Sequence, residues 1–215
     1  MPAPKKKSTN PFLVFLVIFV LWTVYRYFFQ LPDWVDEFFV KPVLQLLPVV
    51  LVVGFVERKS AQSLGIQTKN IGFQVAIGVL AGVLIVGEAL VTRRWMNPQL
   101  TFNPGHLGIL LIARAALVSL ATGFTEETIY RGYFMNRFMK RWHMVVATGM
   151  NSVLFTVVHL PIVIFSLHYG LHDAFTYSLQ VFVLGLVFGF MFAKTKSIVP
   201  SMISHAMWNF TNVLF

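Results

Sequence analysis

The sequence predicts an all-α membrane protein, a polytopic bundle of about seven transmembrane helices. Of its 215 residues, 57% are hydrophobic and only 12% are charged, about half the charge of a soluble domain of this length. Several apolar runs reach the roughly 20 residues that a helix needs to cross a bilayer. The first run continues into WTVYRYFFQ without a cleavage site of small residues, so we expect a retained first helix.

Polar and basic turns divide the apolar runs into elements. A basic, disordered cytoplasmic tail is expected at residues 1–10, followed by N-terminal transmembrane helices over 11–105. Two prolines fall inside the second helix, where neighbouring helices can satisfy the freed carbonyl groups. The predicted helices are residues 11–29, 38–56, 71–91, 106–138, 143–166, 173–193 and 198–214.

The positions of the basic residues predict the orientation. With the N-terminus inside, eleven Lys and Arg residues fall in inner segments, and three (Lys41, Arg93 and Arg94) fall in outer loops. Cytoplasmic loops carry the excess of Lys and Arg, so we expect a cytoplasmic N-terminus and, after seven spans, an outer C-terminus. The same clustering in short loops argues against a nucleic-acid partner for a net charge of +9.

Charge at membrane depth is concentrated in the stretch FTEETIYRGYF, residues 124–134. Each such residue costs at least ~2.5 kcal/mol on insertion scales, so these side chains usually face the bundle interior and pair. Glu127 and Arg131 are four residues apart, on one helical face, and are expected to form an ion pair. Glu126 points about 100° away around the helix axis and must face something else.

Two histidines are expected at the depth of this glutamate. Glu126 and His159 each lie about sixteen residues from the turn near MKRWHM, which places both ~24 Å from it. His205 and Asn209 are four apart on the last helix and share that depth if the hairpin projects about two turns into the cytoplasm. We therefore expect a site in the cytoplasmic half of the membrane that opens toward the cytoplasm.

A buried carboxylate between two imidazoles suits hydrolysis, and the residue types leave two mechanisms open. Without a metal, Glu126 assisted by His159 takes a proton from the attacking water, and His205 with Asn209 stabilises the oxyanion. Alternatively, Glu126, His159 and His205 bind a zinc ion that activates the water. No HExxH motif is present, so the expected cofactor is none or one zinc ion.

Three motifs on separate late helices match one family. EETIYR reads as EExxxR, FTVVH (155–159) as FxxxH, and HAMWN (205–209) as HxxxN. With these motifs in this order, the sequence resembles the CPBP family of intramembrane proteases, also called the Abi or CAAX-protease family, whose eukaryotic members trim the tripeptide from prenylated CAAX proteins. The resemblance covers residues ~106–214. It implies that residues 106–215 form the catalytic core of one integral domain.

The resemblance also implies a role for each motif residue. Glu126 is the implied catalytic base, His159 orients or activates the water, and His205 and Asn209 serve the oxyanion or the geometry of the site. Family members have been described both as metalloproteases and as metal-free glutamate proteases, so the resemblance leaves zinc open. The residues with an implied supporting role are Glu127, Arg131 and Phe155.

The predicted function is hydrolysis of membrane-associated peptides or proteins in a prokaryotic cell membrane. The expected partners are that substrate and the lipid bilayer. An ion- or proton-coupled transporter is the main rival, because buried Glu, His and Arg are typical of transporters as well. The lack of visible internal repeats argues against it. A non-catalytic membrane scaffold or immunity protein on the same fold is the second rival.

Overall fold

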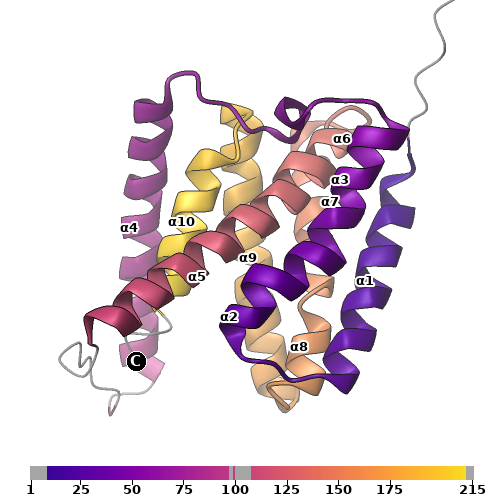
Figure 1. Cartoon of the computed structure of the whole chain (residues 1–215). Coiled ribbons are helices and arrows are strands. Elements are labelled where there is room, and N and C mark those ends of the chain that lie inside the picture. Colours follow the sequence, from indigo (N-terminus) through magenta and orange to yellow (C-terminus); the bar gives the residue numbers. More distant parts are fainter. Residues whose placement is uncertain (1–8, 97–98, 100–107, 212–215) are drawn as a thin grey trace, which may run out of the picture.

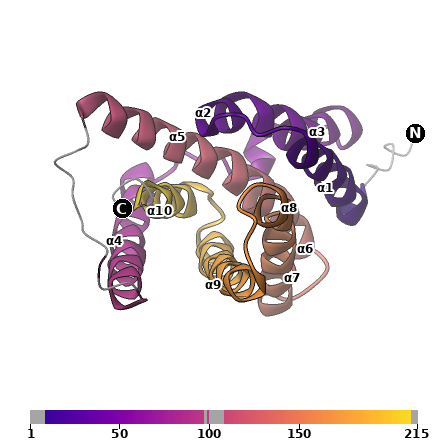
Figure 2. The ribbon, with the colours of Figure 1, turned by 90° about the horizontal axis from the view of Figure 1, so that it is seen from below.

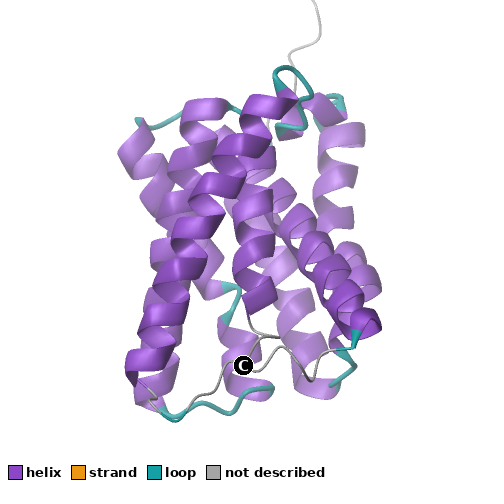
Figure 3. Ribbon diagram, turned by 90° about the vertical axis from the view of Figure 1, so that its left-hand side faces the viewer, coloured by secondary structure: helices purple, strands orange, loops and turns teal. Residues whose placement is uncertain are grey.

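The structure is a computed structural model that describes residues 9–96, 99 and 108–211, and every regular element in these ranges is a helix. The helices form a bundle, and most loops lie at its two ends (Figures 1 and 3). Six helical stretches of the described chain are long and apolar enough to cross a membrane. The predicted all-α polytopic bundle is thereby confirmed. Residues 1–8 of the predicted tail lie outside the described residues.

The spans begin and end within five residues of the predicted helices. A seventh helix, α10 (Val199–Phe210), has 12 residues, about 18 Å, and is too short to cross the roughly 30 Å hydrocarbon core of a bilayer. The end of the predicted seventh span, 212–214, lies outside the described residues. The six long stretches are Pro11–Phe28 (α1), Asp33–Val56, Ile71–Trp95, Ile109–Phe138, Met144–Phe165 and Leu171–Thr195 (α9).

Three of the six spans are divided into shorter elements. Wide, π-helical turns occur in two of them, a feature often found at functional sites. The elements between α1 and α9 are α2 (Asp33–Val35), η1 (Asp36–Val40), η2 (Pro42–Leu46), α3 (Leu47–Leu51), η3 (Val52–Val56), η4 (Ala61–Leu64), α4 (Ile71–Met96), α5 (Ile109–Glu127), η6 (Thr128–Met135), α6 (Asn136–Phe138), α7 (Met144–Val157) and α8 (Leu160–Phe165).

The second span begins at Asp33, five residues before the predicted start at residue 38. Acidic residues in the first turns favour a helix N-terminus because they interact with its positive dipole end, and Asp33 and Asp36 occupy these turns. Lys41 therefore lies eight residues inside the span rather than near its start, with 6% of its surface exposed, and the prediction that it belongs to an outer loop is wrong.

Three helices from both halves of the chain pack around α10. In Figure 2, α10 lies among α4, α5 and α9, all of which it contacts, and α7 packs along α9. Gly123 permits the close approach of α5 to α10, since a Cβ atom at this position would lie 2.8 Å from the carbonyl oxygen of Met202. This approach brings the polar segment at the end of α5 against the middle of α10.

The bundle has two ends of different charge. We call the end where α1 begins the basic end; it lies at the top of Figure 1. The opposite end holds the loop before α2 and the loop between α8 and α9. The basic residues in the described loops and helix termini at the basic end are Arg58, Lys59, Lys69, Arg137, Lys140, Arg141, Lys194 and Lys196.

Candidate active site

Glu126 is a buried carboxylate that lines a cavity of about 650 Å³. It lies near the end of α5, and only 4% of its surface is exposed. Lys41 Nζ donates a hydrogen bond to its Oε1 atom at 2.8 Å. The Oε2 atom has no hydrogen-bond partner among the described residues. A buried carboxylate oxygen without a donor is costly, which makes Oε2 the natural position for a bound water or substrate group.

His159 lies at a break between α7 and α8. Pro161, in the first turn of α8, has no N–H and interrupts the helix. The backbone N–H of His159 bonds to Thr156 instead of Phe155, and the freed carbonyl oxygen of Phe155 lies 2.6 Å from His159 Nδ1. A carbonyl only accepts, so Nδ1 carries the proton. The other ring nitrogen, Nε2, lies 3.9 Å from Oε2 of Glu126.

His205, on α10, lies between the two adjacent glutamates. Its Nδ1 atom donates to Oε1 of Glu127 at 3.0 Å, and its Nε2 atom lies 3.7 Å from Oε2 of Glu126. The carboxylate of Glu127 therefore fixes the ring orientation of His205. The sequence predicted only an ion-pair role for Glu127, and this second contact was missed.

Both imidazoles thus direct Nε2 toward the same unpartnered oxygen of Glu126. Distances of 3.7 and 3.9 Å are too long for direct hydrogen bonds. Polar atoms at such separations are commonly bridged by a water molecule. The geometry can therefore hold a water between one carboxylate oxygen and two imidazole nitrogens.

Glu127 and Arg131 form the ion pair expected from their spacing. Arg131 Nη1 lies 2.9 Å from Glu127 Oε1, and both side chains are fully buried. The guanidinium group lies 4.4 Å from the ring centroid of Phe155 and 5.3 Å from that of Phe188. The same two rings contact the histidines, since Phe155 lies edge-on to His159 at 4.8 Å and Phe188 stacks on His205 at 5.1 Å. Phe155 and Phe188 line the cavity, and the ion pair packs behind them without lining it.

The sequence analysis missed two charged residues and a threonine that join this cluster. Lys41 Nζ also contacts Glu37 Oε1 at 2.5 Å, and Thr122 donates to Glu37 Oε2 at 2.8 Å. The chain of contacts runs from Thr122 through Glu37 and Lys41 to Glu126. The i,i+4 spacing of Glu37 and Lys41 was a usable signal, but it indicates an ion pair only if these residues are helical.

The predicted site residues come together. Asn209 lines the cavity one helical turn beyond His205, and Tyr177 lines it opposite His159, with ring centroids 6.2 Å apart. The predicted residues that line the cavity are Glu126, Phe155, His159, His205 and Asn209.

The cavity opens away from the basic end, contrary to the prediction. Its lining comes from the first turns of the second span, the start of α5, the end of α8 and the last turns of α10. All these segments lie at the opposite end of the bundle. An opening toward the cytoplasm and a cytoplasmic basic end were predicted together, and this combination is wrong. The error came from assuming that the α5–α7 hairpin projects out of the membrane.

Zinc ligation fits the arrangement poorly. No three His, Asp or Glu side chains in the described part of the chain are grouped so that they could hold a metal ion. The ammonium group of Lys41 also bonds to Oε1 of Glu126, which adds a positive charge beside the position a cation would take. The two imidazoles and Glu126 are nevertheless the residues that a metal would require.

Comparisons with known proteins identify the C-terminal half. Residues 108–211 match the family model Rce1-like, described as type II CAAX prenyl endopeptidase Rce1-like. The matched segment contains the EExxxR, FxxxH and HxxxN motifs, and the predicted family is confirmed. No curated protein and no solved structure matches the chain. Glu37 and Lys41 lie outside the matched segment.

Proposed function

We propose, from the premise that residues 108–211 form a Rce1-like domain of the CAAX prenyl endopeptidase family, that this chain is an intramembrane endopeptidase of a prokaryotic cell membrane. It hydrolyses a peptide bond of a membrane-associated peptide or protein inside the cavity lined by Glu126. The observation that carries this proposal is the buried, unpartnered Oε2 atom of Glu126, which two imidazole nitrogens face at 3.7 and 3.9 Å.

The nucleophile is a water held between Glu126 and His159. Its oxygen attacks the scissile carbonyl carbon while one of its protons moves to Oε2 of Glu126, which acts as the general base. His159 accepts the second hydrogen bond of the water at Nε2, because its Nδ1–H donates to the carbonyl oxygen of Phe155. This directs a lone pair of the water oxygen at the substrate.

His205 supplies a donor for the oxyanion. Three carboxylates of the cluster face two cations, Lys41 and Arg131, so the cluster has a net charge of −1 while the histidines are neutral. One proton on His205, which lies between Glu126 and Glu127, makes the cluster neutral. The charged imidazole then donates Nε2–H to the oxyanion, and the amide of Asn209 is the second donor.

The tetrahedral intermediate collapses when the C–N bond breaks. Glu126 returns the proton that it took from the water to the departing amine nitrogen, which regenerates the carboxylate. The new carboxyl and amino termini of the products are uncharged when they form and then exchange protons with water. No covalent bond between enzyme and substrate is formed. No step requires a metal.

Lys41 positions the base. Its ammonium group bonds to Oε1 of Glu126 at 2.8 Å, which leaves Oε2 as the oxygen directed at the water. The ammonium group also donates to Glu37, and the hydroxyl group of Thr122 donates to the other carboxylate oxygen of Glu37. The N-terminal half of the chain thereby contributes to a site whose motifs all lie in the C-terminal half.

Replacement of the base tests the proposal. Glu126→Gln keeps the shape of the side chain but cannot accept the proton, so we expect cleavage to fall by about 10²–10⁴-fold. The readout is the membrane peptides of cells that express the wild-type chain or the variant, compared by mass spectrometry. Glu88→Gln, an exposed glutamate of α4 that bonds to Thr92, is the matched control and should cleave normally. Cleavage that persists in Glu126→Gln refutes the mechanism, and no wild-type product at all favours the transporter or scaffold.

The metal-free mechanism has its own test. We expect purified, active protein to contain far less than one zinc ion per chain and to keep its activity in the presence of a strong chelator. Stoichiometric zinc together with loss of activity on chelation would replace this mechanism with ligation by Glu126, His159 and His205.

A further inference from the structure

We propose that the active-site cavity opens on the extracytoplasmic side of the membrane and that its substrate is a polypeptide segment in the outer half of the bilayer. The substrate class rests on the proposed function, whereas the side of the opening does not. The inference combines three observations: the depth of the cluster, the charge of the two ends, and a second cavity at the lipid-facing surface.

The reactive cluster lies close to the opposite end of the bundle. Lys41 is eight residues after Asp33, about 12 Å along its span, and His159 is six residues before Phe165, about 9 Å. Measured from the basic end, each of the two residues is fifteen residues deep, or about 22 Å. The cavity extends from the cluster toward the opposite end, which is the nearer of the two, because its lining includes Trp34 and Tyr169 at that end.

The charge of the two ends determines which one is cytoplasmic. Lys and Arg accumulate in cytoplasmic loops, and eight of them lie in the described loops and helix termini at the basic end. At the opposite end, the last turn of α4 carries Arg93 and Arg94. Arg26 pairs there with Asp36 at 2.7 Å and Lys41 is buried beside Glu126, as Arg137 is beside Glu57 at the basic end, so none of these three counts as a loop charge. Seven of the eight basic residues then remain at the basic end, against two at the opposite end. Since Lys41 does not belong to an outer loop, the opposite end carries fewer Lys and Arg loop charges than the sequence analysis counted. The basic end is cytoplasmic, and the cavity faces the other side.

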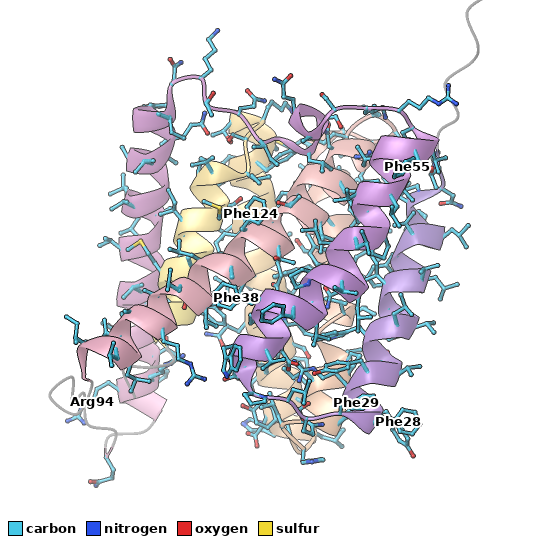
Figure 4. All side chains as sticks on the ribbon, viewed as in Figure 1. Phe28, Phe29, Phe38, Phe55, Arg94 and Phe124 are labelled. Carbon is cyan, nitrogen blue, oxygen red and sulfur yellow. The ribbon has the colours of Figure 1, made fainter. Side chains whose placement is uncertain are left out.

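A second cavity lies beside the active-site cavity, at the surface that lipids would cover. It has a volume of about 290 Å³, lies between the second span and α5, and shares Trp34 and Arg114 with the active-site cavity. Phe38 and Leu117, its other lining residues, are 43% and 59% exposed, and Figure 4 shows Phe38 on this face. This is the face through which we infer that an apolar segment enters sideways from the bilayer.

These features select the substrate class. A segment that enters between the second span and α5 must already be in the membrane, and it reaches Glu126 from the outer half. The chemical class that fits is the membrane-embedded or membrane-adjacent part of an exported or membrane-anchored polypeptide. A prenylated C-terminus on the cytoplasmic surface would lie at the wrong end of the bundle.

The chain contains no cysteine, so single cysteines can report the side of each end directly. Leu167→Cys lies at the cavity, His172→Cys lies at the same end outside it, and Thr68→Cys lies at the basic end; all three positions are exposed. A membrane-impermeant maleimide is applied to sealed bacterial spheroplasts and, in a parallel sample, after detergent lysis.

We expect Leu167→Cys and His172→Cys to be labelled as strongly in sealed spheroplasts as after lysis, and Thr68→Cys to be labelled only after lysis. The reverse pattern overturns the proposal, and so does equal labelling of both ends before lysis. Should substrate or lipid shield Leu167→Cys, His172→Cys decides the side. Because labelling does not depend on cleavage, this result stands whatever Glu126→Gln shows.

Cleavage then tests the substrate class. Two single-span reporter peptides carry the same cleavable segment at the outer or at the inner end of their span. We expect only the outer reporter to be cut, and only by protein with Glu126 intact. Cleavage of the inner reporter alone contradicts the proposed substrate class while supporting the endopeptidase function.

Discussion

The long span that ends at Phe138 contributes to two buried ion-pair clusters, which differ in whether their carboxylate oxygens all have hydrogen-bond partners. At the basic end, Arg137 holds both oxygens of Glu57, at 3.1 and 2.5 Å, and Lys59 adds a contact of 2.6 Å. Nearer the other end, Glu126 and Glu127 each retain an oxygen without a hydrogen-bond partner among the described residues. Glu126 of this second cluster lines the cavity of about 650 Å³. A satisfied carboxylate stabilises a fold, whereas an unsatisfied one beside a cavity can bind and react.

The arginines show the same contrast. Arg137 Nη1 donates to the carbonyl oxygen of Tyr133, and its guanidinium group lies 3.7 Å from the Tyr133 ring centroid, so the Glu57 cluster is closed within itself. Arg131 is buried as well, but its partner Glu127 also orients His205. Substitutions in the Glu57 cluster therefore measure what buried charge contributes to stability. Substitutions in the Glu126 cluster measure what the unpartnered carboxylate oxygen adds to cleavage.

The largest loss of stability is expected for Lys41→Met. It removes the cation from the buried Glu126 and the partly buried Glu37, and breaking a buried pair costs about 3–5 kcal/mol of unfolding free energy. It also releases Glu126, so cleavage per folded molecule should fall by at least about tenfold, the scale on which misplaced catalytic groups act. The measurements are thermal unfolding in detergent and cleavage normalised to folded protein. Lys41→Arg, which keeps the charge, should restore most of the stability; a stable and fully active Lys41→Met would show that Lys41 does not position the base.

Arg137→Met should affect stability alone. It leaves Glu57 buried with only Lys59 as a partner, and we expect a loss of about 3 kcal/mol of unfolding free energy. Cleavage per folded molecule should remain at the wild-type level, because Arg137 does not line the cavity. A fall in this normalised rate would mean that the two clusters are coupled and that the comparison fails.

Acid should weaken the Glu57 cluster. Burial raises the pKa of Glu57, but hydrogen bonds from Arg137 and Lys59 outweigh it and hold the pKa below its ordinary value of 4.5. A carboxyl group with a depressed pKa stabilises the fold above its unfolded pKa, and this contribution is lost as the pH falls through the folded value. We expect the melting temperature of wild type to fall more steeply below pH 4.5 than that of Glu57→Gln. Parallel curves would contradict this role.

The smallest effect is expected for Lys59→Ala. Its side chain is 28% exposed, and exposed ion pairs contribute about 0–1 kcal/mol. The variant should therefore unfold within about 1 kcal/mol of wild type in the same detergent assay. A loss as large as that of Arg137→Met would show that Glu57 depends on both cations equally.

Much of the site was predictable because its motifs are local. Residues four apart share a helical face, so the Glu127–Arg131 pair and the different orientation of Glu126 followed from spacing. The roles of these residues stay predictions until cleavage is measured. Spacing could not predict that Glu127 also bonds to His205, 78 residues later, because that contact depends on the close packing of α5 and α10 at Gly123.

The sequence by itself determined the helical membrane bundle, the family of residues 108–211 and the local pairs, since these depend on composition and on the period of a helix. Only the tertiary structure decided that Lys41 reaches Glu126, 85 residues away, and that the cavity opens at the end opposite the basic loops. The physical reason is that a helix start shifted by a few residues, and the tilt of one helix against another, move charges by many ångströms while the hydrophobic pattern stays the same.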